Sequence, residues 1–323
     1  MSDRYSRQTR LPEVGVEGQA RLGAAAVTVV GAGGLGCAVL EYLTAAGVGR
    51  LTIVDHDRVE ESNLHRQPLY RMGDLGRMKV EAARATLAAL NPEVHIDTLA
   101  ERLTPANAPG LAAAADVLVD AADSFAVTYV LSDACQGQAK PLVSASVLGL
   151  AGYVGVFCGG APSYRAVFPE LPPQAGSCAE AGVLGSAVGV MGTLAAHLTL
   201  ALILRLEPPV LGRLMSVDFR TLHVGGFSFA GAAEPVDTLA FIAPTQVAAS
   251  DLVIDLRGPA EAPLAPFPSA LRLGVEALES APQPLPAERR IVLCCRSGMR
   301  AWRAAQLLRA RGHRNLALLA LGE

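Results

Sequence analysis

Four glycines follow a short apolar run near the start of the chain, in the segment VTVVGAGGLG at residues 27–36. They are Gly31, Gly33, Gly34 and Gly36. This spacing is typical of a tight turn between a strand and a helix, where the backbone and the helix N-terminus can bind a phosphate. Asp55 ends the next apolar run, roughly twenty residues further on, as expected of an acid that binds a ribose. These residues predict a nucleotide-binding site.

Three polar groups suited to phosphate follow Asp55 within a loop and the beginning of the next predicted helix. They are Asn63, Arg66 and Lys79. An arginine can hold a phosphate through two parallel hydrogen bonds, and a lysine neutralises it as a point charge. Positioning and electrostatics of this kind promote attack at phosphorus. Each residue alone would more often be a solvated surface charge, but together they favour a triphosphate.

Two carboxylates lie at the end of another apolar run, in VLVDAADS, where Asp120 and Asp123 follow a predicted strand. Ligands of open α/β folds bind at the carboxyl ends of the strands. A carboxylate there is suited to hold magnesium, so we expect Asp123 to bind Mg²⁺. A helix N-cap or turn acid is the competing interpretation of Asp123.

A second candidate for chemistry is the segment RRIVLCCRSGMRAWRAAQLLRARG near the end of the chain. It predicts a strand, a loop at residues 295–300 and a helix. Cys295 would lie among loop N–H groups at a helix N-terminus, beside Arg296 and Arg300. Such surroundings lower the pKa of a thiol and make it a good nucleophile. The neighbouring Cys294 would face the opposite side of the strand and is expected to be buried.

Apolar runs alternate with Ala-rich helical segments, which predicts a Rossmann-like α/β fold with a mainly parallel sheet. The expected strands are residues 27–30, 51–54, 94–99, 117–120 and 142–147, and a helix is expected at 37–46. After residue 150 strands come in pairs, which predicts antiparallel additions to the sheet. The expected pairs are residues 152–157 with 163–168, and 214–219 with 220–226. We expect a first domain at 1–229, a linker at 230–244 and a small α/β domain at 245–323.

Composition restricts the classes of function. The 323 residues carry a net charge of −3, which does not suggest a nucleic-acid groove. The N-terminus is polar and has no secretory signal, and the six cysteines are scattered, so we expect a reducing cytoplasm. Residues 183–204 are apolar enough to span a membrane, but they lack basic flanks, and we expect a buried packing or dimer helix.

Residues 4–224 resemble the MoeB/ThiF enzymes of molybdopterin and thiamine biosynthesis, which are relatives of the ubiquitin-activating enzymes. The resemblance rests on RYSRQ, VVGAGGLGC, LTIVDHDRVEESNLHRQ, GRMKVEAA, VDAADS and SCAEAGVLG, in this order. It implies ATP- and Mg²⁺-dependent adenylation of the C-terminal Gly-Gly carboxylate of a ubiquitin-like sulfur carrier protein, on a homodimer. The four glycines would then line the ATP, Asp55 would hold the ribose, and Asp123 the magnesium.

The same resemblance assigns the remaining residues. Asn63, Arg66 and Lys79 would meet the phosphates, and Arg7 would reach the ATP of the opposite subunit. Cys178 resembles the crossover-loop cysteine, which forms a covalent link in some relatives and is dispensable in others. Whether Cys178 is catalytic stays open.

Two departures from the family pattern stand out. Ser124 follows Asp123 where many relatives have asparagine. Ser163 and Ala166 stand where relatives carry a CxxC pair of zinc ligands, and no second pair follows Val224. Because structural zinc needs four ligands in a closed tetrahedron, we predict no zinc.

The loop at Cys295 resembles the active loop of a rhodanese-like domain, whose cysteine carries a persulfide. A persulfide donor such as a cysteine desulfurase would load it, and the sulfur would convert the carrier carboxylate into a thiocarboxylate. The chain ends early for such a domain, so its activity stays open. The alternatives are an NAD-dependent oxidoreductase, and a degenerate scaffold that binds a ubiquitin-like protein without activating it. The carrier, and with it the pathway (thiamine, molybdopterin, tRNA thiolation or another), is not specified by the sequence.

Overall fold

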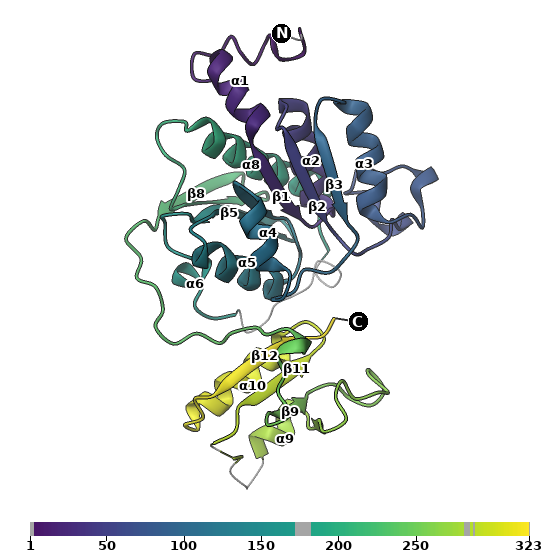
Figure 1. Cartoon of the computed structure of the whole chain (residues 1–323), viewed down its shortest axis with the longest axis vertical. Coiled ribbons are helices and arrows are strands. Elements are labelled where there is room, and N and C mark those ends of the chain that lie inside the picture. The colour runs from purple at the N-terminus through teal and green to yellow at the C-terminus, as the bar shows by residue number, and fades with distance from the viewer. Residues whose placement is uncertain (1–2, 172–181, 281–284, 287, 323) are drawn as a thin grey trace.

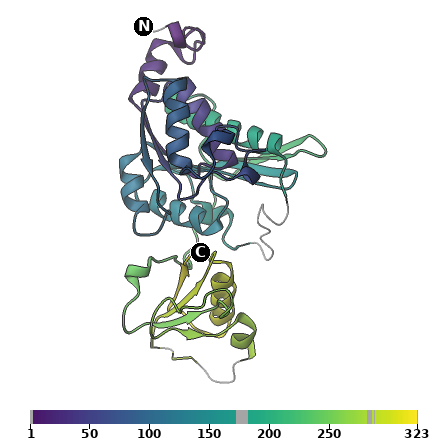
Figure 2. The ribbon, with the colours of Figure 1, turned by 90° about the vertical axis from the view of Figure 1, so that its right-hand side faces the viewer.

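The structure, a computed structural model, describes residues 3–171, 182–280, 285–286 and 288–322. Two α/β units follow one another along the chain (Figure 1). The first is built on an eight-stranded sheet and the second on a four-stranded sheet. The small unit lies below the large one, at the end opposite to the N-terminal segment, and both views show this arrangement (Figures 1 and 2).

The large sheet has the strand order β3-β2-β1-β4-β5-β6-β7-β8. Its strands are β1 (Ala26–Val30), β2 (Arg50–Val54), β3 (His95–Leu99), β4 (Val117–Asp120), β5 (Pro141–Leu148), β6 (Ala151–Cys158), β7 (Arg213–Asp218) and β8 (His223–Ser228). Strands β1 to β5 are parallel, whereas β6, β7 and β8 are added antiparallel. The order reverses at β1, between β2 and β4, where the carboxyl ends of open sheets bind ligands.

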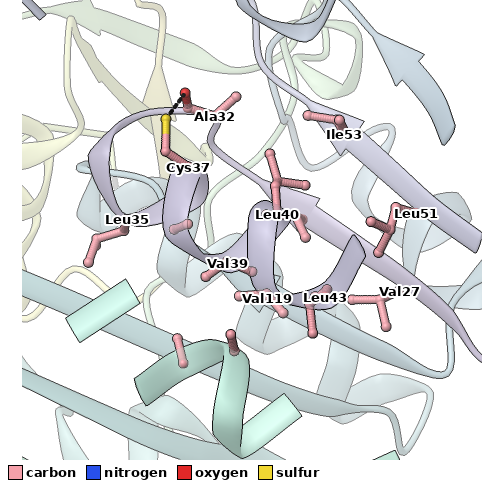
Figure 3. Packing of buried hydrophobic residues seen from close by; sticks show 14 of the residues in the cluster. Val27, Ala32, Leu35, Cys37, Val39, Leu40, Leu43, Leu51, Ile53 and Val119 are labelled. Atoms are coloured by element: carbon pink, nitrogen blue, oxygen red, sulfur yellow. Dashed lines mark hydrogen bonds between the residues drawn. The ribbon is translucent and has the colours of Figure 1, made fainter. Parts of the chain in front are cut away.

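Helices cover both faces of this sheet. They are α1 (Gly15–Ala24), α2 (Gly34–Ala46), α3 (Lys79–Leu90), α4 (Ala108–Ala114), α5 (Phe125–Gly137), α6 (Tyr164–Val167) and α8 (Gly185–Leu204), with short 3₁₀ turns η1 (Asp3–Tyr5), η2 (Glu61–Asn63) and η3 (Met72–Asp74). Helix α2 lays Val39, Leu40 and Leu43 on the buried side chains of β1, β2 and β4 (Figure 3). Helices α4 and α5 share a separate apolar cluster on the other face. The central strands β1, β4 and β5 are thus buried on both sides, as their nearly continuous apolar runs require, whereas the edge strand β8 is largely exposed.

Helix α8 is the one described helix that is long and apolar enough to cross a membrane, by length and composition alone. Half of its most apolar window is buried inside the protein. It packs on α2 and on strands β4, β5 and β6, where Met191, Ala195 and Ala196 are buried. Gly192 permits this approach, because a Cβ there would lie 2.6 Å from the Leu35 carbonyl oxygen. The helix therefore has the packing role expected from its sequence.

The small sheet is wholly parallel and has the order β10-β9-β11-β12. Its elements are η4 (Pro244–Gln246), β9 (Leu252–Asp255), β10 (Leu271–Arg272), α9 (Val275–Ser280), β11 (Ile291–Cys295), α10 (Met299–Ala310) and β12 (Leu316–Ala320). Phe241 pairs with Leu318, so the incoming chain runs beside β12. The apolar cluster of α4 and α5 continues into this unit. Tyr129 of α5 and Trp302 of α10 meet there, with ring centroids 5.3 Å apart.

The predicted fold is confirmed: a mainly parallel sheet with antiparallel additions, followed by a small α/β unit. One predicted strand is wrong, because residues 163–168 contain the short helix α6 instead. Buried Tyr164 accounts for this, since its backbone N–H donates to Ser132 Oγ and its ring packs against Phe157 and Tyr129. Strand β6 pairs with β5 and β7 instead.

Candidate active site

The glycine turn joins β1 to α2, and at three of its four glycines close contacts leave no room for a Cβ. Gly31 has a φ of +96°, and a Cβ there would lie 2.6 Å from the Ala121 carbonyl oxygen. A Cβ on Gly34 would lie 2.6 Å from Val188, and one on Gly36 would overlap the Gly31 carbonyl oxygen. The Ala32 N–H donates to Asp55 Oδ2 at 2.7 Å, which fixes the turn against the end of β2.

A cavity of about 650 Å³ opens at the carboxyl edge of the large sheet beside this turn. Most of the residues predicted from the sequence line it: Gly31, Gly33, Gly34, Asp55, Asn63, Arg66, Lys79 and Asp123. Gly36 lies behind the turn rather than in the wall. Arg7 is exposed on the N-terminal segment and does not line the cavity of its own chain. Cys178 lies outside the described residues.

Lys79 is buried at the first residue of α3, and its Nζ donates to Asp57 Oδ2 at 2.8 Å. Burial alone would raise the pKa of Asp57, but the hydrogen bond and charge of Lys79 hold it below its ordinary value. Arg66 Nη1 donates to the Ser62 carbonyl at 3.2 Å and lies 2.9 Å from His65 Nε2. These hydrogen bonds therefore hold both predicted cations, Arg66 and Lys79, in the wall of the cavity.

Gln67 is a wall residue that sequence reasoning missed. Its side chain is 2% exposed, and Nε2 donates to Asn63 Oδ1 at 3.1 Å. Its Oε1 has no hydrogen-bond partner among the described residues, although it is buried. An unpaired buried oxygen costs about 1–3 kcal/mol, so this atom is suited to accept a hydrogen bond from a bound ligand. Gln67 directly follows Arg66 in the run NLHRQ, which was the available signal.

Asp120 and Asp123 have different roles in this wall. Asp120 is buried, and Oδ2 accepts hydrogen bonds from Thr128 at 2.7 Å and Ser144 at 2.9 Å. Burial raises the pKa of Asp120 to about 6, against the effect of these two hydrogen bonds. Asp123 is exposed to the cavity and makes no hydrogen bond or ion pair with the described part of the chain. The residue at the N-cap of α5 is Ser124, so Asp123 is not the capping acid.

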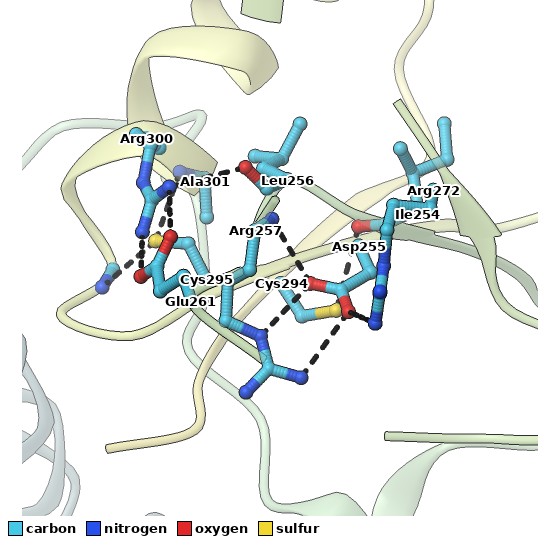
Figure 4. A network of polar contacts seen from close by, with 11 residues as sticks. Ile254, Asp255, Leu256, Arg257, Glu261, Arg272, Cys294, Cys295, Arg300 and Ala301 are labelled. Carbon is cyan, nitrogen blue, oxygen red and sulfur yellow. Dashed lines mark hydrogen bonds and ion pairs between the residues drawn. The ribbon is translucent and has the colours of Figure 1, made fainter. Parts of the chain in front are cut away.

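Cys295 ends β11 and begins the predicted loop (Figure 4). Its Sγ accepts hydrogen bonds from the N–H groups of Gly298 at 3.2 Å and Ala301 at 3.4 Å, at the N-terminus of α10. Arg300 pairs with Glu261 beside it. The Cys295 side chain is buried in this arrangement. The N–H groups converge on the sulfur as predicted, and such surroundings suit a thiolate or persulfide.

Cys294 points to the other side of β11, as predicted, and burial raises the pKa of its thiol to about 12. The neighbouring Asp255 is wholly buried and is paired with Arg257 at 2.9 Å and Arg272 at 3.3 Å (Figure 4). Burial opposes ionisation of Asp255, but the two arginines hold its pKa below the ordinary value. This network fixes the end of β9 next to the Cys295 loop.

Comparison with known proteins then decides the family. The family model described as ThiF family matches residues 5–235. The chain belongs to the ThiF family. A model described as rhodanese-like domain matches residues 243–322 of the same chain. The MoeB/ThiF resemblance and the rhodanese-like domain are thus both confirmed.

Named relatives share this ThiF-family region. A sulfur carrier protein adenylyltransferase of Thermus thermophilus is 46% identical over 235 residues, which are 69% of this chain and 87% of that protein. The bovine protein named adenylyltransferase and sulfurtransferase MOCS3 is 50% identical over 218 residues, 67% of this chain. That match spans 48% of the bovine protein, so the chain aligns with about half the length of such relatives.

Solved structures support the fold of the ThiF-family domain. The crystal structure of E. coli MccB with ATP matches with a TM-score of 0.61 at 21% identity, over 71% of this chain and 72% of that chain. The PaaA structure matches with a TM-score of 0.59 at 23% identity, over 70% and 73% of the two chains. At such identities the likeness concerns the fold alone.

Ser163 stands where ThiF-family relatives were expected to carry a zinc thiolate. Its backbone N–H and its hydroxyl both donate to the Glu234 carboxylate, at 2.5 and 2.6 Å. These hydrogen bonds tie the segment after β8 to the loop before α6. Asp55, His56 and Asp57 bring possible metal-ligating atoms within 4.8 Å of one another. Because Asp55 binds the Ala32 N–H and Asp57 binds Lys79, these carboxylates are already engaged.

Proposed function

We propose that the chain uses ATP to adenylate the C-terminal carboxylate of a ubiquitin-like sulfur carrier protein. The observation that carries this proposal is that one cavity is lined by the glycine turn, Asp55, Arg66, Lys79 and Asp123. The relative from Thermus thermophilus, aligned over 87% of its length, is named for this activity. An oxidoreductase would leave the two cations and the rhodanese-like domain unexplained.

The wall fits a nucleotide in two respects. Close contacts at Gly31 and Gly34 leave no space for a Cβ, which is consistent with the tight glycine turn that binds phosphate in open α/β folds. The buried Gln67 Oε1 is an acceptor without a partner among the described residues. Asp55 would hold the ribose, and Asn63, Arg66 and Lys79 would meet the phosphates. Lys79 would exchange its contact with Asp57 for a phosphate oxygen.

Asp123 fits a magnesium ion, because its carboxylate faces the cavity without a protein partner among the described residues. A divalent cation there would supply charge neutralisation to the triphosphate. Asp120 holds the segment that carries Asp123, through the hydrogen bonds from Thr128 and Ser144. Ser124, in place of the usual asparagine, leaves this arrangement intact in our proposal.

The cavity continues past the glycine turn along β5, β6 and β7, where Ser146, Gly152, Tyr153 and Ser216 line it. This arm would admit the narrow Gly-Gly tail of a carrier. The ionised tail carboxylate attacks the α-phosphorus of ATP, pyrophosphate leaves, and an acyl-adenylate forms. The nucleophile needs no deprotonation at neutral pH, so positioning and the cations supply the acceleration.

Sulfur transfer is the second half of the proposal. A persulfide donor such as a cysteine desulfurase would load Cys295. The terminal sulfur of that persulfide attacks the acyl-adenylate carbonyl, AMP leaves, and an acyl disulfide forms. A second thiol then attacks Cys295 Sγ, the S–S bond breaks, the carrier thiocarboxylate leaves, and a disulfide between Cys295 and that thiol forms. We further propose a cytoplasmic homodimer, in which Arg7 of each subunit reaches the cavity of the other.

Exchange of labelled pyrophosphate into ATP tests adenylation, with candidate carriers ending in Gly-Gly added one at a time. We expect exchange with one carrier and its loss in Lys79→Ala. The chain has one other lysine, Lys140, whose Nζ donates to the Ala115 carbonyl away from the cavity. Lys140→Ala is therefore the matched control and should retain exchange. ATP and carrier binding without exchange would contradict the proposal and favour the scaffold.

A further inference from the structure

Arg102 lies at the rim of the nucleotide cavity and also contacts the C-terminal domain. Its Nη2 lies 2.8 Å from His56 Nε2. Because arginine has no acceptor, Nη2 donates and the imidazole Nε2 accepts. The guanidinium also packs on Gly322, where a Cβ would lie 2.5 Å from Cζ and 2.7 Å from Nη1. One side chain therefore touches both domains.

Toward the nucleotide, Arg102 acts on the loop that follows β2. His56 lies between Asp55, the proposed ribose acid, and Asp57, the partner of Lys79. The same Nε2 is 3.4 Å from Asp57 Oδ1 and, as an acceptor, donates no hydrogen bond to it; the nearby positive charge of Arg102 instead helps to hold the pKa of Asp57 below its ordinary value. Displacement of Arg102 would remove its hydrogen bond to His56. It would also remove a positive charge near Asp57, the partner of Lys79. The position of Arg102 thus bears on the proposed phosphate-binding lysine.

Toward the other domain, Gly322 is tied to the loop of the reactive cysteine. Its N–H donates to the Arg296 carbonyl at 2.9 Å, and the Leu321 N–H donates to the Cys295 carbonyl at 2.9 Å. The same loop touches the large domain, since a Cβ on Gly298 would lie 3.4 Å from Ala126 Cβ. Ala126 is in the first turn of α5, which follows the cavity wall at Asp123 and Ser124.

We propose that Arg102 is a positioning residue that couples the two domains, so that nucleotide binding and docking of the C-terminal domain favour each other. The coupling rests on the proposed function, because it requires that the cavity bind MgATP. Linkage makes it reciprocal: docking raises the affinity for MgATP by the same factor by which MgATP favours docking. Gly322 serves the coupling because any larger residue displaces the guanidinium.

A double-mutant cycle on the full chain measures the coupling, with the Kd of MgATP from calorimetry as readout. Gly322→Ala displaces Arg102, so we expect it to weaken binding about two- to fivefold, the range for a contact that solvent partly screens. In an Arg102→Ala background the same change should have no further effect. Arg102→Lys should restore part of the affinity. Arg84→Ala, which removes an exposed cation on α3 outside the cavity wall, is the control and should bind as the native chain does.

The single tryptophan provides the reciprocal readout. Trp302 is 5% exposed and lies against Tyr129 of the large domain. MgATP should slow acrylamide quenching of Trp302 in the native chain and in Arg84→Ala, but not in Arg102→Ala. Additive effects in the cycle, or equal protection of Trp302 without Arg102, would overturn the coupling. Absence of any MgATP binding to the native chain would instead refute the proposed function on which the coupling rests.

Discussion

The close approach of β1 and the loop after β4 gives the sharpest prediction of the structure. Gly31→Ala places a Cβ 2.6 Å from the Ala121 carbonyl oxygen, whereas ordinary contacts begin at 3.4 Å, so the two segments must separate by about 0.8 Å. Overpacking of this kind costs about 1–3 kcal/mol. The φ of +96° adds about 1–2 kcal/mol, and the stiffer unfolded chain offsets about 0.4–1 kcal/mol.

Gly76→Ala isolates the steric part of this cost. Gly76 has a φ of +81°, but nothing lies within 4 Å of an added Cβ. Both variants have the backbone strain at positive φ and the effect on the unfolded chain, but only Gly31→Ala has the steric clash. Gly76→Ala should therefore lose only about 1 kcal/mol of unfolding free energy. Gly31→Ala should lose roughly 2–4 kcal/mol, and denaturant unfolding of both variants measures the difference.

Binding should separate the two variants further. The segment that Gly31→Ala displaces, Ala121–Ala122, leads directly to Asp123 in the cavity wall. Misplacement by about 1 Å can cost two orders of magnitude at a reacting centre, so we expect at least about a tenfold loss of MgATP affinity. Gly76→Ala should bind MgATP as the native chain does. Equal stability and equal MgATP affinity of the two variants would refute the reasoning.

Two further predictions concern buried groups. Cys295→Ser should abolish persulfide formation on the C-terminal domain. Cys294→Ser should retain it, because burial raises the pKa of the Cys294 thiol to about 12 and keeps that thiol unreactive. Intact-mass analysis of both variants after incubation with a cysteine desulfurase and cysteine tests this. Asp120 has a folded pKa of about 6, above its unfolded value, so its charge destabilises the native chain increasingly as pH rises from about 4 to 6. The unfolding free energy of Asp120→Asn minus that of the native chain should therefore increase by up to about 3 kcal/mol as pH rises from about 4 to 7. A difference that does not depend on pH would contradict this prediction.

Local signals in the sequence account for most of the fold and of the cavity wall. The glycine turn, the strand ending at Asp55 and the strand–loop–helix at Cys295 are each specified within about twenty residues. The glycine turn and Asp55 come together because β1 and β2 are neighbouring parallel strands, whose carboxyl ends lie at one edge of the large sheet. The predicted strand at 163–168 failed for the opposite reason. The conformation of Tyr164 depends on Ser132, which is distant in sequence.

The residues that were missed depend on tertiary structure in the same way. Asp57 carries no signal of its own until Lys79, at the start of α3, lies 2.8 Å from it. Gln67 is notable because its side-chain oxygen is buried without a hydrogen-bond partner among the described residues, and burial cannot be read from the type of residue. Arg102 looks like a solvated charge after β3, and only the contact with Gly322, more than two hundred residues later, distinguishes it.

The burial of Cys295 bears on the order of events in the proposed reaction. A donor enzyme cannot reach a thiol that is 0% exposed, so loading of the persulfide requires that the loop or the whole C-terminal domain move away. Attack on an acyl-adenylate requires the opposite, because the cysteine must be close to the cavity. If MgATP favours docking through Arg102, the nucleotide-free chain is the form that opens for sulfur loading, and the nucleotide-bound chain is the form that transfers sulfur. Persulfide loading by a desulfurase should therefore slow when MgATP is present, and this inhibition should be weaker in Arg102→Ala.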